Sequence, residues 1–151
     1  MIKIQWLGHA AFLVTNGEKR IIIDPYEAGS YSEAVNYKPI RMEADIVLTT
    51  APGRPDHAFT QDIKGTPKII AEAGQHLVNG LKIYAEPDFF DRSGDLERGR
   101  VTVFIMDFGK IRICHLGNLG HLLTEEKVKL LGRVDVLMVP VGGFFTLGVP
   151  E

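Results

Sequence analysis

The sequence predicts a mixed α/β protein, and three observations support this class. Short apolar runs separated by turn residues fill most of the chain, which is typical of β-strands. A single well-capped helix is predicted close to the C-terminus, and another buried strand follows it. The chain has 151 residues, of which 45% are hydrophobic and 24% charged. These values are typical of a globular domain, so we expect residues 1–151 to form a single domain.

The N-terminal segment predicts three strands. Apolar and polar side chains alternate in residues 2–6, which predicts a half-buried strand. Apolar runs at 11–14 and 21–23 flank Asn16-Gly17, a strong hairpin turn signal. The run at 21–23 is continuous and β-branched, so this strand is expected to be covered on both faces.

The middle of the chain predicts more strands and two irregular segments. Residues 26–44 lack clear periodicity and are expected to form a loop with at most a short helix. Residues 45–50 predict a buried strand, and two prolines keep residues 51–57 out of regular structure. The charged segment 87–100 predicts a long loop. Further strands are expected at 67–72, 76–78, 81–86, 101–108 and 110–115.

The predicted helix begins after Thr124, whose hydroxyl is suited to an N-cap. Glu125 and Glu126 follow in the first turn, where the helix dipole favours negative charge. Gly132 predicts a left-handed stop, and residues 134–140 predict one more buried strand.

Composition excludes several classes of function. The net charge of −2 makes nucleic acid a poor partner, and no apolar stretch is long enough to span a membrane. The single cysteine, Cys114, excludes an intramolecular disulfide and, with no signal peptide evident, favours a cytoplasmic location. Cys114 and His115 are neighbours on a strand and face opposite sides, so Cys114 is predicted to lie in the core and not to act as a nucleophile.

Polar residues follow the predicted strands at four places, and such loops commonly carry function. The four places are Gly8-His9, Asp24-Pro25, Asp56-His57 and residues 115–121. His76 has no acidic or histidine neighbour and is assigned no role.

Six segments carry a resemblance to a known family: residues 6–10, 21–25, 45–50, 97–100, 113–121 and 134–143. In this order they resemble the metallo-β-lactamase superfamily, and within it the small metal-dependent hydrolases related to the ascorbate-phosphate lactonases. The resemblance implies an αββα sandwich, here truncated at its C-terminal end. It also implies a zinc cluster built on a His-x-His-x-Asp-His motif.

The sequence departs from that motif at most ligand positions. Its two leading histidine positions fall on Pro52 and Arg54, or on Ala51 and Gly53 after a one-residue slip, and the ligands that the family takes from later loops fall on Phe90 and Asn118. Of the motif only Asp56 and His57 remain, and two protein ligands are fewer than a catalytic zinc ordinarily takes.

Three interpretations follow. The first is a fold that has lost metal binding and hydrolysis, with no catalytic residue and no cofactor. It keeps a binding or structural role for a cleft lined by Asp24, Arg54, Asp56, His57 and Asn118.

The alternative is a metal-dependent hydrolase of a small ester, lactone or phosphoester. It would hold Zn or Mn through a non-standard ligand set that adds His9, His115 and His121 to Asp56 and His57. The third is a subunit that completes its fold against a longer homologous partner.

Two features bear on these interpretations. Arg54 is either a built-in counter-charge for the carboxylates or a solvated loop residue. The apolar segment 141–147 follows the last predicted strand without a covering element, so we expect a homodimer or homo-oligomer formed through the C-terminal region. A small molecule is the other candidate ligand.

Overall fold

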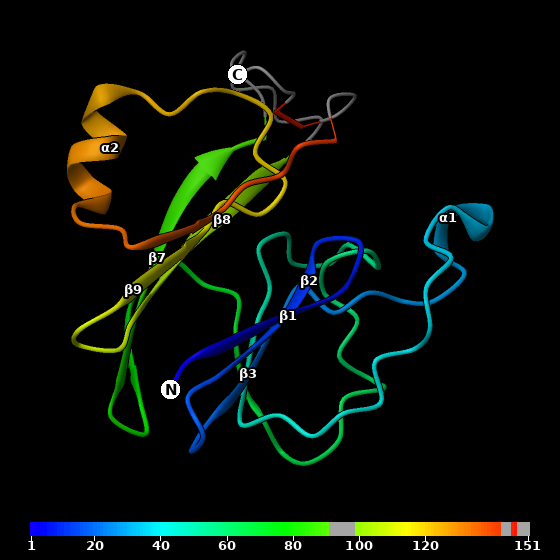
Figure 1. The fold of residues 1–151 in the computed structure, drawn as a ribbon. Coiled ribbons are helices and arrows are strands. Elements are labelled where there is room, and N and C mark those ends of the chain that lie inside the picture. The colour runs from blue at the N-terminus through cyan, green and yellow to red at the C-terminus, as the bar shows by residue number, and fades with distance from the viewer. Residues whose placement is uncertain (91–98, 143–145, 148–151) are drawn as a thin grey trace. The chain divides into compact units, whose positions relative to one another are not determined.

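A computed structural model describes residues 1–90, 99–142, 146 and 147. The chain divides into two compact units, Met1–Ala71 and Glu72–Glu151, and each unit contains a five-stranded sheet (Figure 1). Each unit is described by itself. The described helices are all too short or too polar to cross a lipid bilayer.

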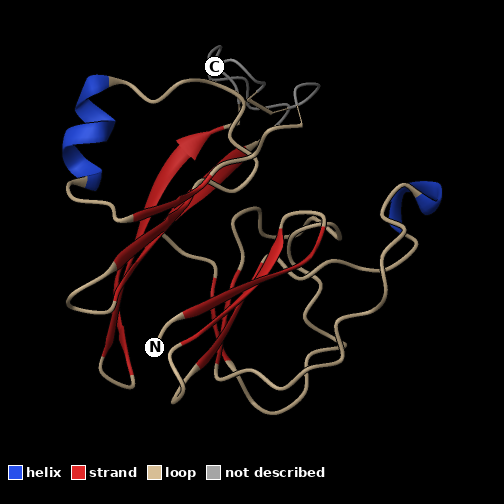
Figure 2. Cartoon of the chain, viewed as in Figure 1, coloured by secondary structure: helices blue, strands red, loops and turns tan. Residues whose placement is uncertain are grey.

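The sheet of the first unit has the order β1-β2-β3-β4-β5 (Figure 2). Strands β1 to β3 are antiparallel, whereas β3, β4 and β5 are parallel. A short helix, α1 (Ser30–Glu33), lies in the long connection before β4. The strands are β1 (Lys3–Gly8), β2 (Ala11–Thr15), β3 (Arg20–Ile23), β4 (Ile46–Leu48) and β5 (Lys68–Ile70).

The parallel pairing of β3 and β4 positions the polar residues that follow them. Ile23 pairs with Leu48, so the carboxyl ends of the two strands lie at one edge of the sheet. Residues 21–23 and 46–48 are completely buried, which confirms the prediction of strands covered on both faces. Asp24 directly follows β3 and Thr50 lies two residues after the end of β4, so these buried strands position both residues.

The prediction of a half-buried first strand is wrong for two of its apolar residues. Ile4 is 39% exposed and Trp6 is 57% exposed. Strand β1 is an edge strand, and the ring of Trp6 packs edge-on against Tyr37 with centroids 5.7 Å apart. The alternation of apolar and polar residues therefore predicted the strand correctly, but it did not predict that Ile4 and Trp6 are exposed.

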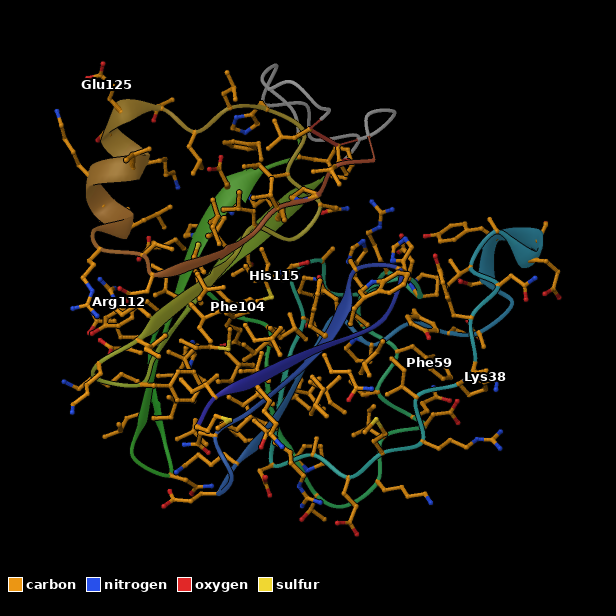
Figure 3. All side chains as sticks on the ribbon, viewed as in Figure 1. Lys38, Phe59, Phe104, Arg112, His115 and Glu125 are labelled. Carbon is orange, nitrogen blue, oxygen red and sulfur yellow. The ribbon has the colours of Figure 1, made fainter. Side chains whose placement is uncertain are left out.

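The sheet of the second unit has the order β10-β9-β8-β7-β6, antiparallel except for the parallel pair β9 and β10. Phe104 and His115 are register partners on β8 and β9 (Figure 3). Cys114 is fully buried, as predicted, and its burial raises the pKa of the thiol to about 12. The strands are β6 (Gly74–Val78), β7 (Leu81–Phe89), β8 (Arg100–Asp107), β9 (Arg112–His115) and β10 (Val136–Met138).

The predicted helix is α2 (Glu125–Leu131), and the Thr124 hydroxyl accepts a hydrogen bond from the Lys127 amide at 3.2 Å. Gly132 ends the helix with φ 65° and ψ −144°. The positive φ agrees with the prediction, but the ψ value lies outside the left-handed helical region.

The predicted loop 87–100 is shorter in the structure. Strand β7 continues to Phe89 because residues 86–89 pair with residues 100–103 of β8. The charged residues at the start of this segment favoured the prediction of a loop. A strand tolerates them because the end of β7 is partly exposed. Within the predicted loop, residues 91–98 lie outside the described residues, and so do residues 143–145 of the predicted apolar tail.

Candidate metal centre

Three side chains that bind metals in other proteins come together in the first unit. One ligand atom each from His9, Asp56 and His57 lies within 4.8 Å of the other two. His9 belongs to the turn between β1 and β2, whereas Asp56 and His57 belong to the irregular segment that follows β4. Asp56 and His57 are buried, and His9 is exposed.

The turn that carries His9 has an unusual backbone. Gly8 has φ 114° and His9 has φ 50°, and the register between β1 and β2 shifts at this point. The indole nitrogen of Trp6 donates a hydrogen bond of 2.8 Å to the carbonyl oxygen of His9. The His9 ring thereby meets the His57 ring edge-on, with centroids 5.1 Å apart.

His57 is oriented by Asp24, the residue that directly follows β3. Its Nδ1 lies 3.1 Å from Oδ2 of Asp24, although no hydrogen bond to any described atom forms at this angle. Asp24 is fully buried and accepts two hydrogen bonds of 2.6 Å, from the amide and the hydroxyl of Thr50. A carboxylate behind a histidine is the usual arrangement around metal-binding imidazoles.

Both carboxylate oxygens of Asp56 accept hydrogen bonds from the positively charged side chain of Arg54. Arg54 donates from Nε to Oδ1 at 3.2 Å and from Nη2 to Oδ2 at 3.1 Å. Tyr31 donates its hydroxyl to Oδ1 at 3.2 Å. Burial alone would raise the pKa of Asp56, but the hydrogen bond from Arg54 and then the electrostatic interactions with His57 and Arg54 hold that pKa below its usual value. Asp56 is therefore ionised at neutral pH.

His9 is held in the neutral form that binds metals. Although His9 keeps an exposed surface, loss of hydration and then the electrostatic interaction with His57 lower its pKa. Asp56 and Asp24 oppose this shift without reversing it. A neutral imidazole offers a nitrogen lone pair to a metal ion.

The cluster fits a divalent cation. Two imidazoles and one carboxylate equal the three protein ligands that a catalytic zinc takes beside water. Oδ2 of Asp56 lies 3.5 Å from Nε2 of His57. Two ligands at ~2.1 Å from a tetrahedral zinc are separated by ~3.4 Å, so this pair needs little adjustment to share one ion.

Four of the five residues predicted to line a cleft lie in the first unit. Asp24, Arg54, Asp56 and His57 lie together in the first unit, and Arg54 pairs with Asp56 with both of its donor groups. This geometry agrees with the counter-charge interpretation of Arg54 and not with a simply solvated side chain. Two members of the site, Thr50 and Tyr31, were missed. The end of β4 beside Asp24 could have indicated Thr50, whereas no sequence signal pointed to Tyr31.

The remaining predicted residues lie in the second unit. His115 is buried, and its Nδ1 accepts the amide of Gly117 at 3.0 Å. His121 contacts Asp88 at 3.5 Å, and Asn118 is buried, with an Oδ1 that accepts no hydrogen bond from a described atom. Phe90 is buried, and His76 contacts the carbonyl oxygen of Glu72.

Comparison with known proteins agrees with the fold. The family model described as a β-lactamase superfamily domain matches residues 3–151. A metal-dependent hydrolase of Thermococcus onnurineus is 29% identical over 176 aligned positions, covering 100% of this chain and 77% of the relative. A metal-dependent hydrolase of Thermococcus kodakarensis is 30% identical, with the same two coverages. The chain therefore spans about three quarters of the length of these relatives.

A crystal structure from Thermotoga maritima, of a candidate Zn-dependent hydrolase of the metallo-β-lactamase superfamily, has a TM-score of 0.77. It is 33% identical, and the match covers 98% of this chain and 66% of that one. The chain belongs to the metallo-β-lactamase superfamily.

These findings correct the expectation that no cofactor is bound. The named relatives are metal-dependent hydrolases, and the His9, Asp56 and His57 group is suited to a metal ion. The expectation was wrong because it gave most weight to the ligand positions of the family motifs. His9 lies outside those positions, in the turn between β1 and β2, and its ring is close enough to Asp56 and His57 for the three to hold a metal ion.

Proposed function

We propose that this chain is a metal-dependent hydrolase that holds one Zn²⁺ or Mn²⁺ ion through His9, Asp56 and His57. The observation that carries the proposal is this ligand cluster, with the buried Asp24 carboxylate directly behind His57. The names of the relatives support the class of activity. The ligand set is non-standard for the family because Pro52 and Arg54 occupy positions where histidines were expected.

The substrate class follows from the chemistry of such a site. His9, Asp56 and His57 would hold the ion, and the bound ion would supply Lewis-acid activation of water for hydrolysis of a small ester, lactone or phosphoester. The protein's own contribution is orientation. Thr50 fixes Asp24, Asp24 fixes the ring of His57, and the Gly8-His9 turn presents His9 to the same point.

The test is hydrolysis of a p-nitrophenyl ester, a small lactone and bis-p-nitrophenyl phosphate, after loading with Zn²⁺ or Mn²⁺. We expect turnover of at least one substrate, its loss with a chelator, and a fall of at least about 100-fold in His9→Ala and His57→Ala. His76→Ala is the matched control, since His76 belongs to the second unit and its Nε2 contacts the carbonyl oxygen of Glu72. Turnover that survives both the chelator and His57→Ala would contradict the proposal, and so would no turnover of any substrate by the loaded protein.

A further inference from the structure

The carboxylate of Asp56 already accepts hydrogen bonds from two side chains of the same unit. Arg54 reaches both oxygens, and Tyr31 adds a hydrogen bond to Oδ1. A carboxylate that pairs in this two-pronged way with a guanidinium is held in one orientation. A metal ion that uses Asp56 as a ligand must compete with this pairing.

Arg54 can leave this pairing more easily than Asp56 can, because the Arg54 side chain is the more exposed of the two. Arg54 stands two residues before Asp56, and its side chain is 38% exposed while that of Asp56 is 8% exposed. The guanidinium therefore has solvent to move into, whereas the carboxylate has little freedom to turn away. The arginine also carries a permanent positive charge, which repels a divalent cation at close range.

The segment that carries Tyr31 is strained. Tyr31, Ser32 and Glu33 have φ values of 52°, 54° and 68°, in a region that side chains other than glycine rarely adopt. A run of this kind persists only where surrounding contacts hold it, and such strain is concentrated at functional sites. The hydrogen bond from Tyr31 to Asp56 is one of those contacts.

We propose that Arg54, assisted by Tyr31, competes with the metal ion for Asp56 and thereby sets the metal affinity of the site. Without metal, Arg54 neutralises the buried carboxylate. When the ion binds, Arg54 withdraws toward solvent, and the Tyr31 segment loses one of its contacts. This inference rests on the proposed metal site, which it deepens by assigning the residues that weaken metal binding.

The experiment is titration of the metal-free protein with Co²⁺, a spectroscopic substitute for Zn²⁺, followed by cobalt absorption and by tryptophan fluorescence. The chain has one tryptophan, and Trp6 is hydrogen-bonded to the backbone of His9, so its emission reports on the site. Arg54→Gln removes the charge and the paired donors. Arg41→Gln is the control, because it removes the same charge from an exposed position of the same unit.

We expect Arg54→Gln to bind Co²⁺ about tenfold more tightly than the wild type, and Arg41→Gln to match the wild type. Arg54→Lys keeps the charge without the two-pronged geometry and should fall between them. Tyr31→Phe, which loses the single hydrogen bond from the hydroxyl to the Asp56 carboxylate, should tighten binding about two- to threefold. Melting temperatures with and without Co²⁺ provide a second readout. The metal-induced rise should be larger in Arg54→Gln, because this variant also loses stability when metal-free.

Equal or weaker binding by Arg54→Gln and Arg54→Lys, beside a wild type that does bind Co²⁺, would overturn the competition and leave the metal site intact. If neither the wild type nor any Arg54 variant bound Co²⁺, the proposed metal site itself would fail. The two failures are therefore distinguishable.

Discussion

Single residues around the metal centre adopt backbone conformations that most side chains avoid. Gly8, His9 and Asp24 all have positive φ, at 114°, 50° and 48°. Gly8 is also a point of close approach, since a Cβ built there would lie 2.7 Å from two ring carbons of Tyr37. The position of His9 therefore depends on the glycine that precedes it.

Gly8→Ala should lower the free energy of unfolding by about 2–3 kcal/mol, because it combines backbone strain with a steric clash. Urea unfolding measures this change. Gly17→Ala is the matched control, since Gly17 has φ 93° but nothing within 4 Å of a built Cβ. The control should lose clearly less stability, and equal losses would show that the contact with Tyr37 contributes nothing.

At the scale of elements, the parallel pair β3 and β4 supports the site at one end and is tied by an ionic network at the other. Asp45 accepts hydrogen bonds from the Arg20 backbone at 2.7 Å and from the Arg20 guanidinium at 3.4 Å. The backbone hydrogen bond first, and then the side-chain hydrogen bonds, hold the pKa of Asp45 below its usual value. This carboxylate fixes the start of β4 relative to the start of β3.

A carboxyl group whose pKa is lower in the folded state stabilises the protein above its unfolded pKa of about 3.9. That stabilisation is lost as the pH falls through the folded value. Asp45→Asn should therefore lower the melting temperature at about pH 6, and its difference from the wild type should shrink toward about pH 3. Asp62→Asn, in the same unit but outside the Arg20 network, is the control. A difference for Asp45→Asn that does not change with pH would contradict this account.

Elements were more predictable from the sequence than the site. The Asn16-Gly17 hairpin, the buried runs at 21–23 and 46–48, and the Thr124 cap depend on local propensity, and the structure confirms them. The metal cluster depends on a contact between distant segments. Because ligands were counted at the positions of the family motifs, His9 was considered only as a substitute, and the absence of metal was wrongly expected.

Exposure was also difficult to predict. The alternation in β1 indicated a buried face, yet Ile4 and Trp6 are exposed on an edge strand. Periodicity shows that residues share a face, but it does not show what packs against that face. Tyr31 was missed for a related reason, since its contact with Asp56 depends on a left-handed segment with no local sequence signature.

At the scale of the whole molecule, the prediction of one domain remains to be tested, because the chain consists of two compact units. We expect one cooperative unfolding transition. Trp6 fluorescence follows the first unit, and reaction of the buried Cys114 with a thiol reagent follows the second. The two probes should change at the same urea concentration. Separate midpoints would show that the units unfold independently.

Association is a second prediction at this scale. We propose a homodimer formed through the C-terminal region, because Leu137, Val139 and Val141 are 48%, 42% and 62% exposed at and after the edge strand β10. Exposed apolar residues on a sheet edge favour pairing with another chain. Light scattering at micromolar concentration should give twice the monomer mass, and Leu137→Lys should lower it. A monomeric wild type would contradict the proposal.

The most direct measurement of the central claim is metal stoichiometry by elemental analysis, after incubation with Zn²⁺ or Mn²⁺ and removal of the unbound ion. We expect about one ion per chain in the wild type and in His76→Ala, and almost none in His9→Ala or His57→Ala. Almost no metal in the wild type would contradict the account, and so would full occupancy in His57→Ala.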